Sequence, residues 1–376
     1  MRADSALVRE TGTGEYGIIY HVPRPFRLDS GAILPVLDIA YTTTGELNSD
    51  GTNAVLVCHA LTGNAHAVDT VLPDGRSVSG WFNGIIGPGR GLDTGKYFVV
   101  CANILGSCYG TTGPASPNPA TGASYGPDFP QMTVRDMVRA EKLLLEYLNV
   151  HSLVTIIGGS LGGMQALEWA VLYPELVRTI VPIATAARHS AWCIGISETQ
   201  RLAITSDPDW KGGRYHRQPE RGLAIARAIA MISYRSNPSF QKRFGREEVS
   251  SGDGHERIRI FPETSPSYAV ESYLRYQGQK LVDRFDANTY IALTRTMDLH
   301  DLGKGRAPLA EVLGEIRARA LSVGISSDIL YPPEEQREIA SSIPGGEYVE
   351  IDSPHGHDAF LIEFDQLNAL LREFLS

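Results

Sequence analysis

The sequence contains few cysteines, and their spacing matches no common metal or redox motif. The four are Cys58, Cys101, Cys108 and Cys193. They form no CxxC pair, and Cys58 and Cys101 sit in apolar runs where a thiol behaves as a small hydrophobic side chain. There is also no HExxH spacing. We therefore expect neither a metal site nor a disulfide framework.

Long apolar runs and clusters of positive charge are also missing. No stretch approaches the roughly 20 apolar residues that span a bilayer. The start, MRADSALVRETGTGEYG, lacks the apolar core of a signal peptide. The formal net charge is −9, and no run of Lys or Arg could neutralise phosphates. We therefore expect a cytoplasmic protein with no membrane and no nucleic-acid partner.

The sequence does contain alternating strand and helix patterns. Six short apolar runs are typical of strands buried on both faces: 54–58, 97–103, 153–159, 179–184, 319–325 and 347–351. Helical spacing occurs between or after them, at 134–148, 161–173 and 367–375. This alternation predicts an α/β fold with a mostly parallel, doubly wound sheet. Residues 26–41 alternate around a Ser-Gly turn and predict an antiparallel hairpin at one edge.

Two segments break the alternation. Residues 188–300 have helical patterns without a convincing strand, and we interpret them as a helical lid inserted into a core of residues 1–187 and 301–376. Residues 106–130 form a long loop rich in Gly, Pro, Ser and Asn. Long loops inside compact cores are usually functional, so we expect this one near the active site.

A GxSxG motif lies between a predicted strand and a predicted helix. Ser160 is flanked by Gly158 and Gly162 in the run IIGGSLGGMQALEWA. A sharp strand-to-helix turn strains the serine backbone and leaves no room for side chains at the flanking positions, hence glycine. The turn also sets the hydroxyl at a helix N-terminus. The motif has neither the Lys of a P-loop nor a GxGxxG pattern, and we predict that Ser160 is a nucleophile.

A strand–serine–helix turn of this kind, called a nucleophile elbow, is followed along the chain first by an acid and then by a histidine base. Candidates for both occur after Ser160. Asp328 lies in a short loop after an apolar run, where a carboxylate can orient an imidazole. Asp352 and Asp358 could mimic this acid. The loop DSPHGHDAFL offers two bases, His355 and His357, and spacing alone does not separate them.

An oxyanion hole needs two backbone N–H groups, one after the nucleophile and one from an early loop. The loop HALTG follows the first apolar run, so we assign these roles to the amides of Leu61 and Leu161. Four other histidines are interpreted as loop or packing residues and not as bases: His59, His66, His255 and His300.

Several segments together resemble the homoserine O-acetyltransferase family, which has the α/β-hydrolase fold. They are HALTGNAH, GWFNGIIGPGRGLDTGKYFVVCANILGSCYGTTGP, DFPQMTVRDMV, GGSLGGMQALEWA, GLAIARAIAMISYRS, SSDILYPPEEQ and GHDAFL. They run in family order along nearly the whole chain. The resemblance is therefore far more specific than an isolated GxSxG.

The resemblance implies roles for individual residues. It identifies the catalytic imidazole as His357, within GHD, and makes Arg227 and Asp358 the groups that hold the carboxylate and amine of an amino acid. Arg235 is the alternative to Arg227. A guanidinium suits a carboxylate because it can donate two parallel hydrogen bonds. This chain has Leu161 after the nucleophile where many relatives carry Met, a change of similar volume.

The resemblance also implies a reaction. Acetyl-CoA would acetylate Ser160, and L-homoserine would then take the acetyl group in a ping-pong mechanism of methionine biosynthesis. Acetyl-CoA is a cosubstrate, and no permanently bound cofactor is expected. Members of the family are commonly dimeric, so we expect a homodimer that forms through the lid.

Other functions remain open on the same scaffold. Succinyl-CoA could replace the donor, and L-serine could replace the acceptor. Water could be the acceptor in a serine esterase, although an esterase needs no amino-acid clamp. A noncatalytic binding protein of this fold is a further alternative, but such proteins often lose a triad member.

Overall fold

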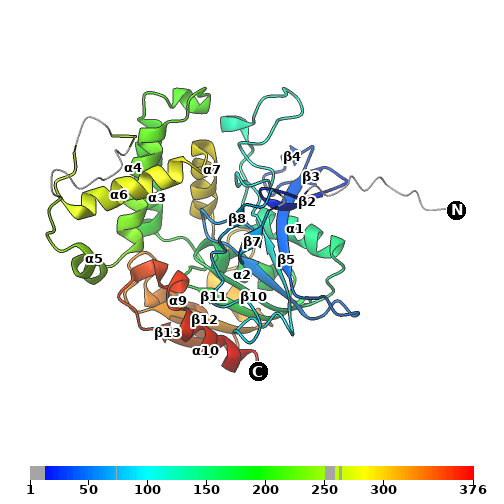
Figure 1. Cartoon of the computed structure of the whole chain (residues 1–376). Helices are drawn as coiled ribbons and strands as arrows, with labels where there is room; N and C mark the ends of the chain where they lie inside the picture. The colour runs from blue at the N-terminus through cyan, green and yellow to red at the C-terminus, as the bar shows by residue number, and fades with distance from the viewer. Residues whose placement is uncertain (1–12, 73, 250–258, 262–264) are drawn as a thin grey trace.

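A single large sheet runs through the centre of the protein (Figure 1). The structure is a computed structural model that describes residues 13–72, 74–249, 259–261 and 265–376. Within them the sheet order is β1-β2-β5-β9-β6-β10-β11-β12-β13. In this sheet order, β9 and the five strands after it (β6, β10, β11, β12 and β13) are parallel to one another. They match the predicted runs: β6 (Ala54–Cys58), β9 (Phe98–Ala102), β10 (Leu153–Gly159), β11 (Val177–Ile183), β12 (Arg319–Ile325) and β13 (Glu347–Ile351). The predicted α/β-hydrolase fold is confirmed.

Helices cover both faces of this sheet. They are α1 (Val134–Tyr147), α2 (Leu161–Leu172), α8 (Leu309–Gly314), α9 (Pro333–Ser342) and α10 (Phe364–Phe374). Every residue of β6 is buried, and successive side chains point to opposite faces. Leu56 belongs to the apolar cluster that includes Leu167 of α2. Val57 belongs to the cluster on the other face with Leu367 of α10. This burial on both faces explains why the strands are apolar throughout.

The predicted edge hairpin forms only in part, and it does not lie at the edge of the main sheet. β3 (Phe26–Arg27) and β4 (Ile33–Leu34) pair in a separate two-stranded sheet. Pro35 follows, and proline cannot donate a ladder hydrogen bond. The antiparallel edge of the main sheet consists instead of three other strands: β1 (Thr13–Gly14), β2 (Gly17–His21) and β5 (Asp38–Thr44). A further small hairpin pairs β7 (Thr70–Val71) with β8 (Ser77–Val78).

The segment between β11 and β12 is helical in the residues that the structure describes. It contains α3 (Ala191–Thr205), η2 (Lys211–Gly213), α4 (Glu220–Tyr234), α5 (Asn237–Phe244), α6 (Ala269–Val282) and α7 (Ala287–Asp298). The two ends of the predicted lid, 188–300, come together, since His189 N donates to His300 O at 2.9 Å. These helices group on one side of the sheet (Figure 1).

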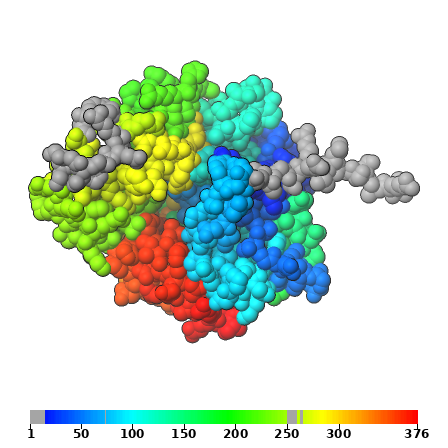
Figure 2. Space-filling model, viewed as in Figure 1, coloured from blue at the N-terminus to red at the C-terminus, as the bar shows by residue number. Residues whose placement is uncertain are grey.

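The helical segment rests on the C-terminal part of the core. In the space-filling view the green and yellow helices lie directly above the red C-terminal residues (Figure 2). There the end of α4 packs against η3 (Gly356–Leu361). A short turn, η1 (Gly126–Asp128), lies in the long loop 106–130. No helix in the described ranges has both the length and the apolar character needed to cross a bilayer.

Candidate active site

The predicted nucleophile sits on a strained turn between β10 and α2. Ser160 has φ 58° and ψ −124°, a region that non-glycine residues rarely adopt. A Cβ added to Gly162 would lie 2.1 Å from the carbonyl oxygen of Cys58, and one on Gly158 would lie 2.6 Å from the Gly162 backbone. The motif glycines are therefore required because three backbone segments meet at this turn.

The predicted acid and base form a buried pair. Asp328 follows β12, and His357 lies in η3. Asp328 Oδ2 accepts from His357 Nδ1 at 2.7 Å. The other oxygen, Oδ1, accepts from the amides of Leu330 at 2.8 Å and Tyr331 at 3.0 Å. Because both carboxylate oxygens are occupied, Asp328 is fixed, and His357 Nε2 is left as the nitrogen that can act as a base.

The surroundings favour the protonated form of His357. Burial lowers the pKa of the imidazole, but the charge of Asp328, its hydrogen bond and the charge of Asp358 outweigh burial. The pKa is therefore raised above the ordinary value of 6.5. An imidazolium formed during proton transfer is stabilised by this arrangement.

The loop that carries His357 lies against the turn that carries Ser160. A Cβ on Gly159 would lie 2.5 Å from the ring of Phe360, and Phe360 packs edge-on to His357 with ring centroids 5.6 Å apart. Within the described part of the chain, no hydrogen bond joins Ser160 Oγ to His357. Such bonds are often long without substrate and tighten when the reacting complex forms.

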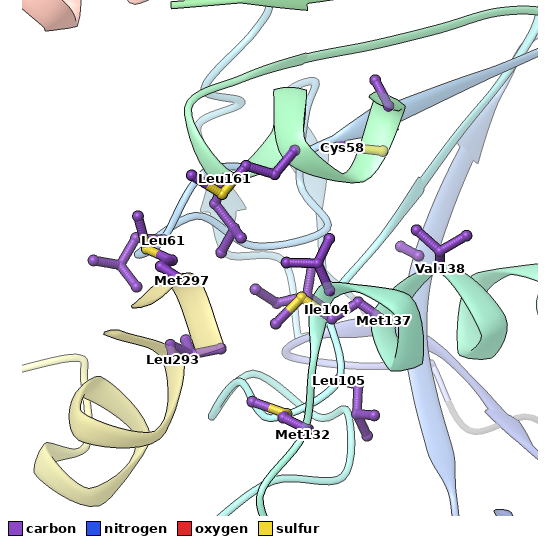
Figure 3. Close-up of a cluster of buried hydrophobic side chains, with 14 of the residues drawn as sticks. Cys58, Leu61, Ile104, Leu105, Met132, Met137, Val138, Leu161, Leu293 and Met297 are labelled. Atoms are coloured by element: carbon purple, nitrogen blue, oxygen red, sulfur yellow. The ribbon is translucent and has the colours of Figure 1, made fainter. Parts of the chain in front are cut away.

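The two predicted oxyanion donors are both available. The turn Ala60–Gly63 is closed by the bond from Gly63 N to Ala60 O at 2.9 Å. Leu61 is the second residue of this turn, and its N–H takes no part in that bond. Leu161 begins α2, where N–H groups lack intrahelical acceptors. Neither amide has a protein acceptor among the described residues. Both side chains are buried in one apolar cluster, drawn with Met297 of α7 in Figure 3.

His59 braces the loop that carries the Leu61 amide. Its Nε2 accepts from Ile104 N at 3.1 Å, so its proton is on Nδ1, which donates to Ala60 O at 2.8 Å. Burial lowers its pKa to about 4, which keeps the ring neutral. His66 and His300 bond to the backbone oxygens of Glu15 and Ala186.

The other histidines do not alter the assignment of the base. His355 has an Nδ1 without a hydrogen-bond partner in the described region, whereas His357 is the one paired with Asp328. His255 lies outside the residues that the structure describes. Within those residues, no group of three or more His, Cys, Asp or Glu side chains is arranged for a metal ion.

The two candidate arginines differ in their partners. Arg235 Nε lies 3.1 Å from Asp358 Oδ2, so its charge is already matched. Arg227, on α4, has its guanidinium 5.7 Å from the ring centroid of Tyr234 and no carboxylate partner among the described residues. The Tyr234 ring in turn lies 5.5 Å from that of His357. Among the described residues, Arg227 is therefore a cation without a carboxylate partner, and Tyr234 is the ring that contacts both it and His357.

Some contacts at the site were not predicted. Tyr331 packs on His357 with ring centroids 5.3 Å apart. Arg284, between α6 and α7, donates to Thr62 O at 2.8 Å and to the hydroxyl of Tyr109 at 2.5 Å. Tyr109 belongs to the long loop 106–130, so this arginine links that loop to the loop that carries Leu61. Nothing local in the sequence marks these residues, because their partners lie far along the chain.

Comparison with known proteins places the chain among α/β hydrolases. Residues 53–364 match a family described as alpha/beta hydrolase fold. A homoserine O-acetyltransferase from Moorella thermoacetica is 54% identical over 362 residues, which cover 95% of each protein.

Solved structures agree with that fold. The homoserine O-acetyltransferase of Bacillus anthracis has a TM-score of 0.86 at 27% identity and covers 95% of this chain and 96% of its own. Esterase E22 has a TM-score of 0.85 at 27% identity, with 95% of this chain and 99% of that chain covered. The fold is thus shared by a transferase and an esterase.

Proposed function

The chain belongs to the homoserine O-acetyltransferase family of α/β-hydrolase-fold enzymes, and we propose that it transfers an acetyl group from acetyl-CoA to L-homoserine through Ser160. The observation that carries this proposal is the buried Asp328–His357 pair, with 2.7 Å between Nδ1 and Oδ2, packed beside the strained turn that holds Ser160. The proposed machinery is Ser160 as nucleophile, His357 as general base and Asp328 as its orienting acid.

The first half-reaction acetylates the enzyme. His357 Nε2 takes the proton of the Ser160 hydroxyl, and Oγ attacks the thioester carbonyl carbon of acetyl-CoA. The amides of Leu61 and Leu161 stabilise the oxyanion. The carbon–sulfur bond then breaks, and the CoA thiol leaves with the proton from His357.

The second half-reaction repeats these steps in reverse. The homoserine hydroxyl gives its proton to His357 and attacks the acetyl-serine. The ester of homoserine leaves, and Ser160 regains its proton. Both halves pass through an oxyanion at the same two amides. This predicts ping-pong kinetics.

Arg227 supports an amino-acid acceptor. Its positive charge has no carboxylate partner among the described residues and suits the carboxylate of homoserine, which a guanidinium can bind with two parallel hydrogen bonds. Arg235 is less suited because Asp358 already neutralises it. Asp358 would then bind the substrate amine while it stays paired with Arg235. Water needs neither group, which argues for a transferase over an esterase.

We also propose that residues 188–300 act as a lid and as the surface through which two copies pair. Large apolar side chains on its helices are exposed: Trp192 58% and Leu202 54% on α3, Ile225 43% and Ile232 55% on α4, and Tyr276 52% on α6. Ile225 and Ile232 are seven residues apart, so they share one face of α4. Pairing would bury that face.

The experiment is a matrix of donors and acceptors with detection of free CoA. Acetyl-CoA and succinyl-CoA are each combined with L-homoserine, L-serine or water. We expect rapid CoA release only with acetyl-CoA and homoserine. Hydrolysis of p-nitrophenyl acetate that is fast and unaffected by homoserine would instead indicate the esterase, and preference for succinyl-CoA or serine would change the substrates.

A further inference from the structure

A fully buried threonine contacts the backbone of the nucleophile. Thr185 comes just after β11, and its hydroxyl donates to the carbonyl oxygen of Ser160 at 2.7 Å. The residue before it, Ala184, has φ 45°, a left-handed conformation that is rare for alanine. This strained turn is what directs Thr185 toward the elbow. Strain of this kind persists only where the surrounding structure holds it.

A buried glutamine connects Thr185 to the loop of the catalytic acid. Gln336 Oε1, on α9, accepts from Thr185 N at 2.8 Å. Its Nε2 donates to the carbonyl oxygens of Tyr331 at 3.3 Å and Pro332 at 3.0 Å. The amide of Tyr331 donates to Asp328. A continuous set of buried hydrogen bonds therefore runs from the acid loop to the nucleophile.

The contact at Ser160 has a consequence for the oxyanion hole. The Ser160 carbonyl and the Leu161 N–H belong to one planar, trans peptide unit, so they point in opposite directions. A bond that holds the carbonyl toward Thr185 therefore holds the N–H on the other side. The same oxygen also accepts from Gly163 N at 2.9 Å and Met164 N at 3.2 Å, so Thr185 makes the shortest of three contacts. Hydrogen bonds to a carbonyl also polarise its peptide and strengthen the N–H as a donor.

We propose that Thr185 is a positioning residue for the reaction, which acts by orienting the Leu161 amide toward the oxyanion, and that Gln336 holds Thr185 in place. The inference deepens the proposed function and rests on it. Thr185 touches neither substrate nor His357 in this role. Its loss should slow every step that forms an oxyanion, while it leaves substrate binding and the ionisation of His357 unchanged.

Packing must be separated from hydrogen bonding in the test. A Cβ added to Gly163 would lie 2.6 Å from Thr185 Cβ, so Thr185 also packs tightly on α2. Thr185→Val keeps the shape and removes the hydroxyl. Thr185→Ser keeps the hydroxyl and removes the methyl group, and Thr185→Ala removes both. Ser and Ala differ only in the hydroxyl, so they decide the question even where the Val variant does not fold.

The measurement is the rate of Ser160 acetylation by acetyl-CoA, followed by quenching and mass spectrometry, with steady-state kcat and KM. Removal of an oxyanion donor costs roughly 100-fold to 1,000-fold, so misorientation of one should cost about tenfold or more in the Val and Ala variants. The Ser variant should recover most of the rate. KM should not change, and neither should the pH at which kcat/KM falls to half of its maximum on the acid side. Gln336→Leu should show a smaller loss of the same kind.

Two results would overturn the inference. Acetylation of the Val and Ala variants at the wild-type rate would remove any role for the hydroxyl. A Ser variant as slow as the Ala variant would show that Thr185 acts only by packing. A wild-type protein that forms no acetyl-serine would be a different outcome, because it overturns the proposed function and this inference together.

Discussion

At the scale of single residues, the proposed chemistry depends on the charge of Asp328. Its carboxylate lies in a buried site and accepts three hydrogen bonds, one of them from His357. Replacement by a neutral amide would keep the shape of the side chain and remove the charge that stabilises an imidazolium. The consequence should be visible in the pH dependence of the reaction as well as in its rate.

Because His357 must be neutral to act as a base, kcat/KM should fall as the pH drops through its pKa. That pKa is raised above 6.5, chiefly because the charge and hydrogen bond of Asp328 outweigh burial. We expect an acid midpoint above 6.5 in the wild type. In Asp328→Asn the midpoint should move down, and kcat should fall by a factor on the order of 1,000 to 10,000.

Asp352→Asn is the matched control, because Asp352 is exposed and bonds to Ser326 outside the pair. It should leave the profile unchanged. An acid midpoint that is the same in Asp328→Asn and the wild type would contradict the role of Asp328.

The two arginines make a second prediction at this scale. Arg227→Gln should raise the KM for homoserine by about tenfold or more, because a charge-assisted hydrogen bond contributes roughly 1.5–3 kcal/mol. Acetylation by acetyl-CoA should be unaffected. Arg217→Gln is the control, since that side chain is 73% exposed. Stopped-flow and steady-state kinetics separate the two steps, and an unchanged homoserine KM in Arg227→Gln would exclude it as the clamp.

At the scale of elements, some features could be predicted and others could not. The parallel strands were predictable because burial on both faces requires continuous apolar runs. The turn at Ser160 was predictable because backbone crowding requires glycine at positions 158 and 162. The prediction that residues 26–41 form one hairpin was wrong, because only β3 and β4 pair with each other while β5 joins the main sheet. Alternation indicates a half-buried strand but does not indicate which strand it pairs with. Arg235 and Asp358 pair across a long stretch of chain, and no local pattern encodes that contact.

The packing of α1 on α2 includes a buried carboxyl group. Glu141 is 2% exposed; its Oε2 accepts from Trp169 Nε1 at 2.6 Å, while Oε1 has no partner among the described residues. Burial raises its pKa to about 8, against a smaller lowering by Trp169. The folded state therefore binds a proton more tightly than the unfolded state does. The stability that this proton provides is complete below the ordinary pKa of 4.5 and is lost as the pH rises toward 8.

We therefore expect the melting temperature of the wild type to fall between about pH 5 and pH 8.5, and the fall to be smaller in Glu141→Gln. At the higher pH the variant should melt above the wild type. Glu146→Gln, on the same helix but 53% exposed, should follow the wild type. Differential scanning calorimetry across this range is the measurement. Parallel curves for wild type and Glu141→Gln would show that Glu141 is ionised at neutral pH.

At the scale of the whole molecule, we propose that the helical segment 188–300 carries the amino-acid clamp and the surface through which two copies pair. Tyr234 of α4 packs near His357, Arg227 of α4 lies near Tyr234, and apolar side chains such as Ile232 are exposed on the same segment. We expect a dimer in solution and a monomer for Ile232→Asp, measured by light scattering after size exclusion. Val71→Asp is the control, because Val71 is 72% exposed but lies on β7. A monomeric wild type would contradict pairing.

The central claim is that Ser160 carries the acetyl group, and intact-protein mass spectrometry tests it most directly. The purified protein is mixed with acetyl-CoA alone, quenched and weighed, and the adduct is mapped by peptide fragmentation. We predict a gain of one acetyl group on Ser160, its loss when homoserine is added, and no gain in Ser160→Ala. An unmodified Ser160, or an adduct that persists in the Ala variant, would contradict the account.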